Sequence, residues 1–349
     1  MTAPPFAHSS GPRTAKLALV GVAWGEQEEL VGQPFVGASG QELNKLLAEV
    51  GLRRSECFAT NVFALRPEGN NIEKFTAKKA EAGGGAQHPP LHQGAYFREE
   101  FLPELARLRE ELDEVRPNLV LALGATACWA LLASAKIGAL RGSVTQTHKG
   151  FLARPLKVLP THHPAVIFHN WALRPIVQAD LLKAERECRF AEIRRPHREL
   201  IVEPSLEDVL SWFERPAQAY SCDTETLRGQ IEMIGFARSR SDAIVIPFVD
   251  LGHPGRSYWP DLETELIVRR VVYGALASSI PKIFQNGLYD LQYLVREGCY
   301  PRNCCDDTML KHHSMYPELE KGLGFLGSIY SNEQSWKLLR HEVANKKDE

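Results

Sequence analysis

The sequence lacks any apolar run approaching the roughly 18 residues that a membrane-spanning helix needs. Residues 1–16 are rich in proline, serine and glycine and have no apolar core of the kind found in a signal peptide. The seven cysteines are odd in number and include no C-x-x-C pair, which argues against a disulfide framework and a zinc knuckle. We therefore expect a soluble, cytoplasmic protein with reduced thiols and no membrane partner.

A strong net charge is also lacking. Lys and Arg number 41 against 43 Asp and Glu, a formal net charge of −2. The overall charge therefore does not attract nucleic acid, and DNA contact must depend on local basic patches. Residues 194–198, Arg-Arg-Pro-His-Arg, form such a patch, although a solvated linker has the same composition. At 349 residues the chain is long for one domain and suits two.

The first half of the chain alternates strands with helices. Apolar runs predict strands at 16–23, 57–63, 118–124 and 157–161. Apolar residues at helical spacing predict helices at 41–50, 97–115 and 125–132. Right-handed crossovers between such strands give a doubly wound α/β fold, with a parallel sheet covered on both faces. The glycine- and proline-rich residues 80–92 predict a flexible loop.

The second half has a different pattern. Charges and prolines interrupt the apolar rhythm at residues 189–204, where we place the domain boundary. Strands are then predicted in quick succession at 219–226, 231–239 and 243–249, followed by a helix at 261–277 and a strand at 281–285. Short turns between successive strands indicate a meander, so the second domain is expected to contain a mixed sheet.

Acidic residues are spaced for metal binding in the second half. Asp223 and Glu225 lie two apart on a predicted strand and therefore project from the same face. Clustered carboxylates suit Mg²⁺ or Mn²⁺, and two such ions activate water for phosphodiester hydrolysis. A lone D-x-E also occurs on solvated strands. Asn286 and Asp290 follow at a strand end and one helical turn later, and then comes Asp307-Thr308-Met309.

The motifs D-x-E, N-x-x-x-D and D-T-M, in this order, resemble the DEDD proofreading 3′→5′ exonuclease of family A DNA polymerases. The downstream segments 315–330 and 335–337 resemble the phage-type branch, and the likeness covers about residues 219–340. It implies a ribonuclease-H-like domain that acts on single-stranded DNA 3′ ends in an infected bacterial host. It also implies that Asp223, Glu225 and Asp290 hold two Mg²⁺ or Mn²⁺ ions, with Asn286 at the edge of the site and Asp307 supporting the fold.

The final motif of that family, Y-x-x-x-D, has no counterpart. Asp348 follows Ala344 at the position where the family carries Tyr, and the sequence ends at Glu349. The two-metal site is therefore expected to be incomplete in this chain. The resemblance implies that a separate chain supplies the missing motif and the polymerase domain, or that the chain is a truncated product.

A second set of motifs occupies the first domain. It consists of turn and strand-end segments at 21–25, 32–40, 60–62, 66–70, 123–127 and 161–165. Taken one by one these segments are typical of turns. Together, over about residues 16–185, they resemble the family 4 uracil-DNA glycosylases and the related domain that precedes some phage polymerases.

The resemblance implies a pocket at the carboxyl ends of parallel strands. Phe35 supplies a stacking face for an extruded base, and Asn61 pairs with the uracil edge. His163 donates to the carbonyl that gains negative charge, while backbone NH groups at Gly25 and Gly37 contact phosphate or base oxygens. The alternatives are that Phe35 is a core aromatic and that His163 is a structural histidine.

Two departures from the glycosylase family bear on activity. Val22 stands where the family carries a Glu that positions or activates water, although Glu26 and Glu28 lie further along the turn. Members of the family also hold an iron–sulfur cluster on four cysteines, whereas Cys57 and Cys128 are elsewhere. We therefore expect no cluster, and uracil binding more readily than excision.

The sequence as a whole predicts four segments: a disordered stretch at 1–15, a uracil-DNA-glycosylase-like domain at 16–188, a linker at 189–204, and an incomplete exonuclease domain at 205–349. The main interpretation is metal-dependent hydrolysis of DNA 3′ ends during phage DNA replication. The alternatives are a catalytically impaired DNA-binding subunit of a split polymerase and a uracil-DNA glycosylase.

Overall fold

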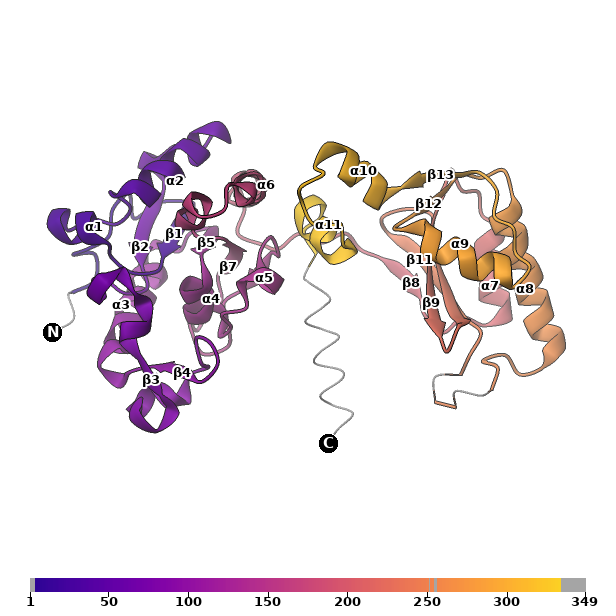
Figure 1. Cartoon of the computed structure of the whole chain (residues 1–349), viewed down its shortest axis with the longest axis horizontal. Helices are drawn as coiled ribbons and strands as arrows, with labels where there is room; N and C mark the ends of the chain where they lie inside the picture. Colours follow the sequence, from indigo (N-terminus) through magenta and orange to yellow (C-terminus); the bar gives the residue numbers. More distant parts are fainter. Residues whose placement is uncertain (1–3, 251, 254–255, 334–349) are drawn as a thin grey trace. The chain divides into compact units, whose positions relative to one another are not determined.

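The computed structural model describes residues 4–250, 252–253 and 256–333, which form two compact units (Figure 1). The first unit contains the chain up to Arg194 and also the segment that begins at Gly324, and the second unit is Arg195–Leu323. The motif at residues 335–337 and the carboxyl-terminal residues 344–349 lie outside the described residues. No helix in the described part combines the length and the apolar character that crossing a membrane requires.

The first unit is built on a largely parallel sheet with the strand order β2-β1-β5-β7-β6 (Figure 1). Its strands are β1 (Leu17–Gly21), β2 (Phe58–Asn61), β5 (Leu119–Leu123), β6 (Thr145–Gln146) and β7 (Lys157–Thr161). In the order β2-β1-β5-β7 each strand pairs in parallel with its neighbour, and β6 pairs with β7 in the antiparallel direction. The helices are α1 (Glu26–Val31), α2 (Ala38–Glu49), α3 (Pro103–Val115), α4 (Ala125–Leu132), α5 (Ile137–Leu140) and α6 (Arg174–Glu187).

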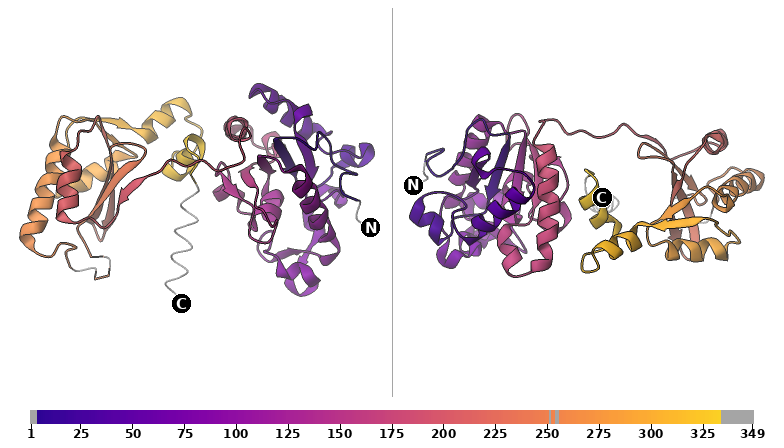
Figure 2. Two further views of the ribbon diagram at one scale, coloured as in Figure 1. Left: turned by 180° about the vertical axis from the view of Figure 1, so that it is seen from behind. Right: turned by 90° about the horizontal axis from the view of Figure 1, so that it is seen from above.

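Helices cover both faces of this sheet, which confirms the expected doubly wound arrangement. Ala18 and Val20 of β1 point into a core shared with α3 and α4, whereas Leu17 and Leu19 point into a second core shared with α2 and α6. Strand side chains alternate between faces, so a strand that is apolar at every position needs a helical layer on each side. Figure 2 shows the helices on either side of the strands.

The amino-terminal residues are packed, which corrects the expectation of disorder over 1–15 for the part that is described. The ring of Phe6 meets that of Phe58 edge-on at 5.9 Å, and its amide donates to a Glu111 carboxylate oxygen at 3.0 Å. Ser10 forms a β-bridge with Ala59. An aromatic side chain covers the edge of the sheet here, so this segment buries enough apolar surface to be ordered.

The region expected to be a loop at 80–92 lies between two short strands, β3 (Thr76–Lys78) and β4 (Ala95–Phe97), which pair antiparallel. Short 3₁₀ turns connect them. The helix predicted from residue 97 begins instead at Pro103, because proline lacks the N–H that a helix interior uses and favours a first helical turn.

The second unit contains a mixed sheet with the order β13-β12-β9-β10-β11-β8 (Figure 1). Its strands are β8 (Glu199–Ile201), β9 (Tyr220–Leu227), β10 (Gln230–Ala237), β11 (Asp242–Pro247), β12 (Lys282–Phe284) and β13 (Cys304–Asp307). Its helices are α7 (Leu206–Glu214), α8 (Leu262–Ala277), α9 (Gly287–Arg296) and α10 (Thr308–Met315). The expected linker at 189–204 therefore contributes β8, which pairs in parallel with β11 at the sheet edge.

One apolar core holds the second unit together. Trp212 of α7, Val272 of α8 and Leu294 of α9 all pack against inward side chains of the strands, such as Cys222 and Phe236. Along β9 the buried positions alternate with exposed ones. The alternation leaves Asp223 and Glu225 on the face of β9 opposite to Cys222.

Candidate functional site

A cavity of about 480 Å³ opens at the carboxyl-terminal edge of the parallel sheet in the first unit. Val22 follows the end of β1, Asn61 is the last residue of β2, and His163 lies two residues beyond β7. Crevices at the carboxyl ends of parallel strands are the usual ligand sites of open α/β sheets. The structure thus brings Phe35, Asn61 and His163 together, as expected from the sequence, and Gly25 also lines the cavity.

Phe35 is held in the cavity wall by an unusual backbone conformation. Its φ of 59° lies in the left-handed region, and its side chain is 6% exposed. A β-carbon at Gly21 would come within 2.7 Å of the Phe35 ring and 2.1 Å of the Asn61 side-chain oxygen. The absence of a side chain at Gly21 is therefore what allows Phe35 and Asn61 to approach each other.

Asn61 presents a side-chain amide that the fold leaves for a ligand. The residue is 3% exposed, and its backbone carbonyl accepts a hydrogen bond of 2.6 Å from Arg107. Among the residues that the structure describes, none makes a hydrogen bond to the Asn61 side chain. The amide is therefore available to a hydrogen-bonding ligand in the cavity.

Arg107 was not recognised from the sequence as part of the site. Its guanidinium contacts the carboxylates of Glu104 and Glu111, both at 2.9 Å, and all three residues are buried. It also donates to the carbonyl oxygens of Asn61 and Val62. The spacing of Glu104, Arg107 and Glu111 on one helical face is the signal that would have identified this network.

His163 is neutral and has a defined tautomer. Burial lowers its pKa to about 4, and the nearby Glu28 carboxylate only partly offsets this. The backbone amide of Ala165 donates to Nδ1 at 3.2 Å, so the proton of the neutral ring lies on Nε2. The ring lies 6.4 Å from that of Phe35, centroid to centroid, with 22° between their planes. His163 is therefore a hydrogen-bond donor, through Nε2–H, in the wall of the cavity.

The backbone amides of Gly25 and Gly37 do not stand free for a ligand, which corrects the role expected for them. Both donate to the buried carboxylate of Glu28, Gly25 at 3.1 Å and Gly37 at 2.9 Å. Gly25 caps α1 and Glu28 occupies its third position, so the carboxylate satisfies an orphan amide of the first turn. Glu28 thereby fixes both glycine turns and adds a negative charge to the cavity.

Trp24 and Val22, both in the motif at residues 21–25, also line the cavity. The buried indole Nε1 of Trp24 has no hydrogen-bond partner in the described part of the chain, and its ring meets His8 edge-on at 4.6 Å. Val22 presents an aliphatic side chain to the cavity, where the glycosylase resemblance implies a carboxylate.

The buried cysteines of the first unit do not offer the donor set of an iron–sulfur cluster. Burial raises the pKa of Cys57 to about 11 and that of Cys128 to about 12, so both remain thiols at neutral pH. A cluster requires four thiolates in one place. In the described ranges, no three His, Cys, Asp or Glu side chains come together in a way that would hold a metal ion.

The acidic residues of the second unit also form no group that would hold a metal ion, among the residues that the structure describes. Asp290 is buried, and its Oδ1 accepts hydrogen bonds from the Thr224 amide at 2.8 Å and from the Thr224 hydroxyl at 2.7 Å. Burial raises the pKa of Asp223 to about 6, with smaller contributions from the negative charges of Asp290 and Glu225. The carboxylates thus lie close enough to repel one another, but they do not form a metal-binding group among the described residues.

Asn286 and Asp307 shape the start of α9. Asn286 adopts a left-handed conformation with φ 59°. The backbone amides of Asn286 and Gly287 donate to the two Asp307 carboxylate oxygens, at 3.1 and 2.8 Å respectively. Asp307 also caps α10, accepting from Met309 and Leu310. Partial burial is the largest single influence on the pKa of Asp307 and acts to raise it. The backbone hydrogen bonds together outweigh burial, so the pKa lies below its ordinary value. Asp307 therefore supports the fold.

The parallel sheet, its helical layers and this polar, aromatic-walled cavity define an α/β protein with a candidate ligand site at the carboxyl-terminal edge of the sheet. Residues 8–187 match the family model of the Uracil DNA glycosylase superfamily, and the chain belongs to that superfamily. The type-4 uracil-DNA glycosylase of Archaeoglobus fulgidus is 29% identical over 183 residues, which cover 51% of this chain and 79% of the relative. The corresponding enzyme of Thermotoga maritima is 30% identical over 179 residues, covering 50% and 79%.

Comparison with solved structures finds a crystal structure of the EXD2 exonuclease domain soaked in Mn. It is 15% identical, with a TM-score of 0.23, and the match covers 34% of this chain and 58% of that one. The same domain soaked in Mg and dGMP matches with a TM-score of 0.22 and 17% identity, covering 40% and 72%. At these scores the likeness supports no conclusion about fold or activity.

Proposed function

We propose that the first unit recognises uracil in DNA by receiving the extruded base in its cavity. The observation that carries this proposal is the side-chain amide of Asn61, which is buried in the cavity and has no hydrogen-bond partner in the described chain. Uracil offers an N3–H donor beside carbonyl acceptors, and an amide side chain pairs with both. Phe35 supplies the apolar face against which the base stacks.

His163 adds a hydrogen-bond donor for a carbonyl oxygen of uracil. Because the ring is neutral with its proton on Nε2, it donates to a carbonyl oxygen without a positive charge being buried. Negative charge that develops on a uracil carbonyl during cleavage of the glycosidic bond would strengthen this hydrogen bond.

Recognition is proposed ahead of excision because of Val22. An aliphatic side chain neither orients water nor stabilises positive charge on the sugar, and the Glu28 carboxylate is occupied by two backbone amides. The unit then acts as a uracil-sensing DNA-binding module with slow glycosylase activity at most.

The test compares binding of single-stranded oligonucleotides that carry one uracil or one thymine. Asn61→Ala should weaken uracil binding about tenfold or more, since a buried hydrogen-bonded pair is lost. Asn170→Ala is the matched control, because that amide caps a turn outside the cavity. Equal binding of uracil and thymine, unaffected by Asn61→Ala, would contradict the proposal.

A second candidate function rests on Asp223 and Glu225, which lie on one face of β9, with Asp290 near enough to contribute to the raised pKa of Asp223. A ribonuclease-H-like 3′→5′ exonuclease that acts on DNA ends with Mg²⁺ or Mn²⁺ would use these carboxylates. The candidate includes a separate chain carrying the Y-x-x-x-D motif and a phage polymerase domain, with the host cytoplasm as its setting. Because the described residues form no metal-binding group, no hydrolytic step is assigned to them.

Degradation of a 3′-labelled oligonucleotide in the presence of Mg²⁺ or Mn²⁺ tests this candidate. Activity that is lost in Asp223→Asn would support it, whether it arises in the chain alone or after the downstream polypeptide is added. Single-strand binding without cleavage under both conditions would leave the second unit as a binding module.

A further inference from the structure

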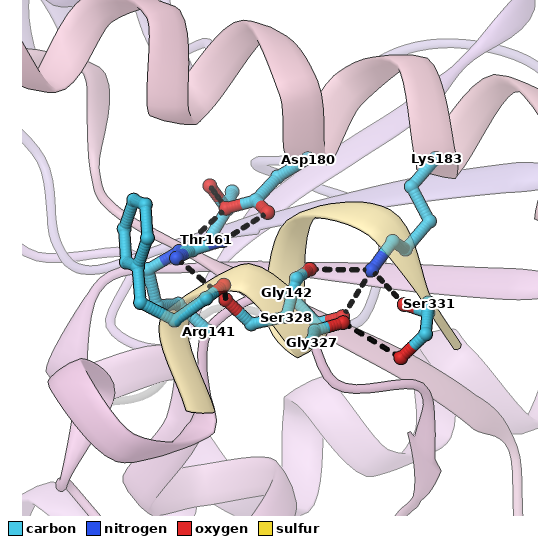
Figure 3. Close-up of polar contacts among 9 residues, drawn as sticks. Arg141, Gly142, Thr161, Asp180, Lys183, Gly327, Ser328 and Ser331 are labelled. Carbon is cyan, nitrogen blue, oxygen red and sulfur yellow. Dashed lines mark hydrogen bonds and ion pairs between the residues drawn. The ribbon is translucent and has the colours of Figure 1, made fainter. Parts of the chain in front are cut away.

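The carboxyl-terminal end of α11 (Leu323–Tyr330) meets a buried lysine of α6 (Figure 3). The Lys183 ammonium donates to three carbonyl oxygens: those of Gly142 at 2.7 Å, Ser328 at 2.6 Å and Ser331 at 2.6 Å. The last carbonyls of a helix have no partner inside the helix and carry partial negative charge. Lys183 therefore satisfies the end of α11 and interacts favourably with its dipole.

Arg141 contacts the same helix from the other side. It forms a two-point ion pair with Asp180, at 3.2 and 2.9 Å, and its remaining Nη1 donates to the Ser328 hydroxyl at 2.9 Å. Its guanidinium also lies 5.2 Å from the centroid of the Phe325 ring. Arg141 and Asp180 are 4% and 0% exposed, so these contacts form away from water, where they are stronger.

The surface of the first unit is shaped for this helix at Gly142. The residue has φ 73°, and a β-carbon on it would lie 2.5 Å from the Ser328 carbonyl oxygen. The helix end thus approaches the backbone more closely than a side chain would permit. Burial lowers the pKa of Lys183 to about 8, and the negative charge of Asp180 partly offsets this effect.

Asp180 connects this contact to the end of β7. The carboxylate oxygen that accepts from Arg141 Nε also accepts from the Thr161 hydroxyl at 2.8 Å. Thr161 is the last residue of β7, and His163 of the cavity follows two positions later. One buried network of Arg141, Asp180 and Thr161 therefore connects α11 to the end of β7, two residues before His163 (Figure 3).

We propose that Arg141, Gly142 and Lys183 form a docking site for the carboxyl-terminal end of a helix. The segment from Gly324 fills this site in cis, and its docking holds the end of β7 in the conformation that positions His163. Asp180 is the positioning residue that transmits the contact. The docking itself is independent of the proposed uracil recognition, and only the significance of His163 rests on it.

The experiment is hydrogen exchange measured by mass spectrometry on the full chain. Gly142→Ala places a methyl group against the Ser328 carbonyl and should speed exchange in residues 324–333 about tenfold or more, in line with the cost of overpacking. Gly150→Ala is the matched control: φ at Gly150 is 87°, and nothing lies within 4 Å of its β-carbon. It carries the same backbone strain and should leave residues 324–333 protected.

A variant on the helix side guards against general loss of the fold. Leu326 of α11 is 5% exposed, and Leu326→Glu should undock the helix and so remove the contact of Arg141 with Ser328. Exchange that stays as slow as in the unaltered chain in both Gly142→Ala and Leu326→Glu would overturn the docking site. Faster exchange at 324–333 with unchanged exchange at 158–168 would overturn the link to His163. Neither readout uses uracil, so failure of the proposed function is seen separately in the binding test.

Discussion

The guanidinium of Arg107 donates a hydrogen bond of 2.6 Å to the backbone carbonyl of Asn61. This contact joins the interior of α3 to the end of β2, where the cavity begins. The same guanidinium forms ion pairs with Glu104 and Glu111, both of which are buried. The position of the proposed uracil-reading amide therefore depends on a buried charge cluster that touches no ligand.

Arg107→Met should destabilise the first unit strongly. It leaves two buried carboxylates without a cation, and breaking a buried ion pair in this way costs about 3–5 kcal/mol. Urea denaturation of the full chain measures the loss. Arg109→Met, on the exposed side of the same helix, is the control and should change stability by less than about 1 kcal/mol. Similar losses in both variants would show that the cluster is not the cause.

Uracil binding should be insensitive to pH between about 8 and 5.5. His163 has a pKa of about 4 and stays neutral through this range, whereas a histidine with the ordinary value of 6.5 would become charged. Since the folded-state pKa is lowered, His163 also lowers stability as pH falls from 6.5 to 4, because the unfolded chain takes up the proton first. Binding and urea midpoints measured from pH 8 to 4 check both statements. The stability slope in this window should be smaller in His163→Asn.

Val22→Glu should raise uracil excision. A carboxylate at this position in the cavity can orient water or stabilise positive charge on the sugar, and positioned acid–base groups contribute about 10²–10⁴-fold. Abasic sites formed on uracil-containing DNA provide the measurement. Val31→Glu is the control, since that side chain is 58% exposed and does not line the cavity. If Val22→Glu forms no more abasic sites than the unaltered chain, the missing carboxylate is not what limits excision.

Asp223→Asn should stabilise the second unit at pH 8. The folded-state pKa of about 6 lies above the ordinary 3.8, so the charged carboxylate costs stability that grows as pH rises from 3.8 through 6. The difference between variant and unaltered chain should shrink below about pH 4. Thermal unfolding at pH 4, 6 and 8 tests this. If Mg²⁺ raises the melting temperature of the unaltered chain but not of Asp223→Asn, a cation binds at these carboxylates after all.

The sequence by itself determined the elements and the edge at which the cavity lies. Continuous apolar runs predicted β1 and β5 because strands buried on both faces need apolar side chains at every position. Phe35, Asn61 and His163 were found from motifs at strand ends, since the carboxyl ends of parallel strands share one edge. Each of these signals is contained within a few consecutive residues of the chain.

Only the tertiary structure decided what those residues touch. Glu28 accepts from the Gly37 amide nine positions away, and Phe6 packs on β2, although neither pairing is marked by a local pattern. Arg141 and Ser328 are hydrogen-bonded across a separation of 187 positions, so the segment after the second unit completes the first. Periodicity and capping are short-range properties of the chain, whereas such pairings depend on which surfaces folding brings together.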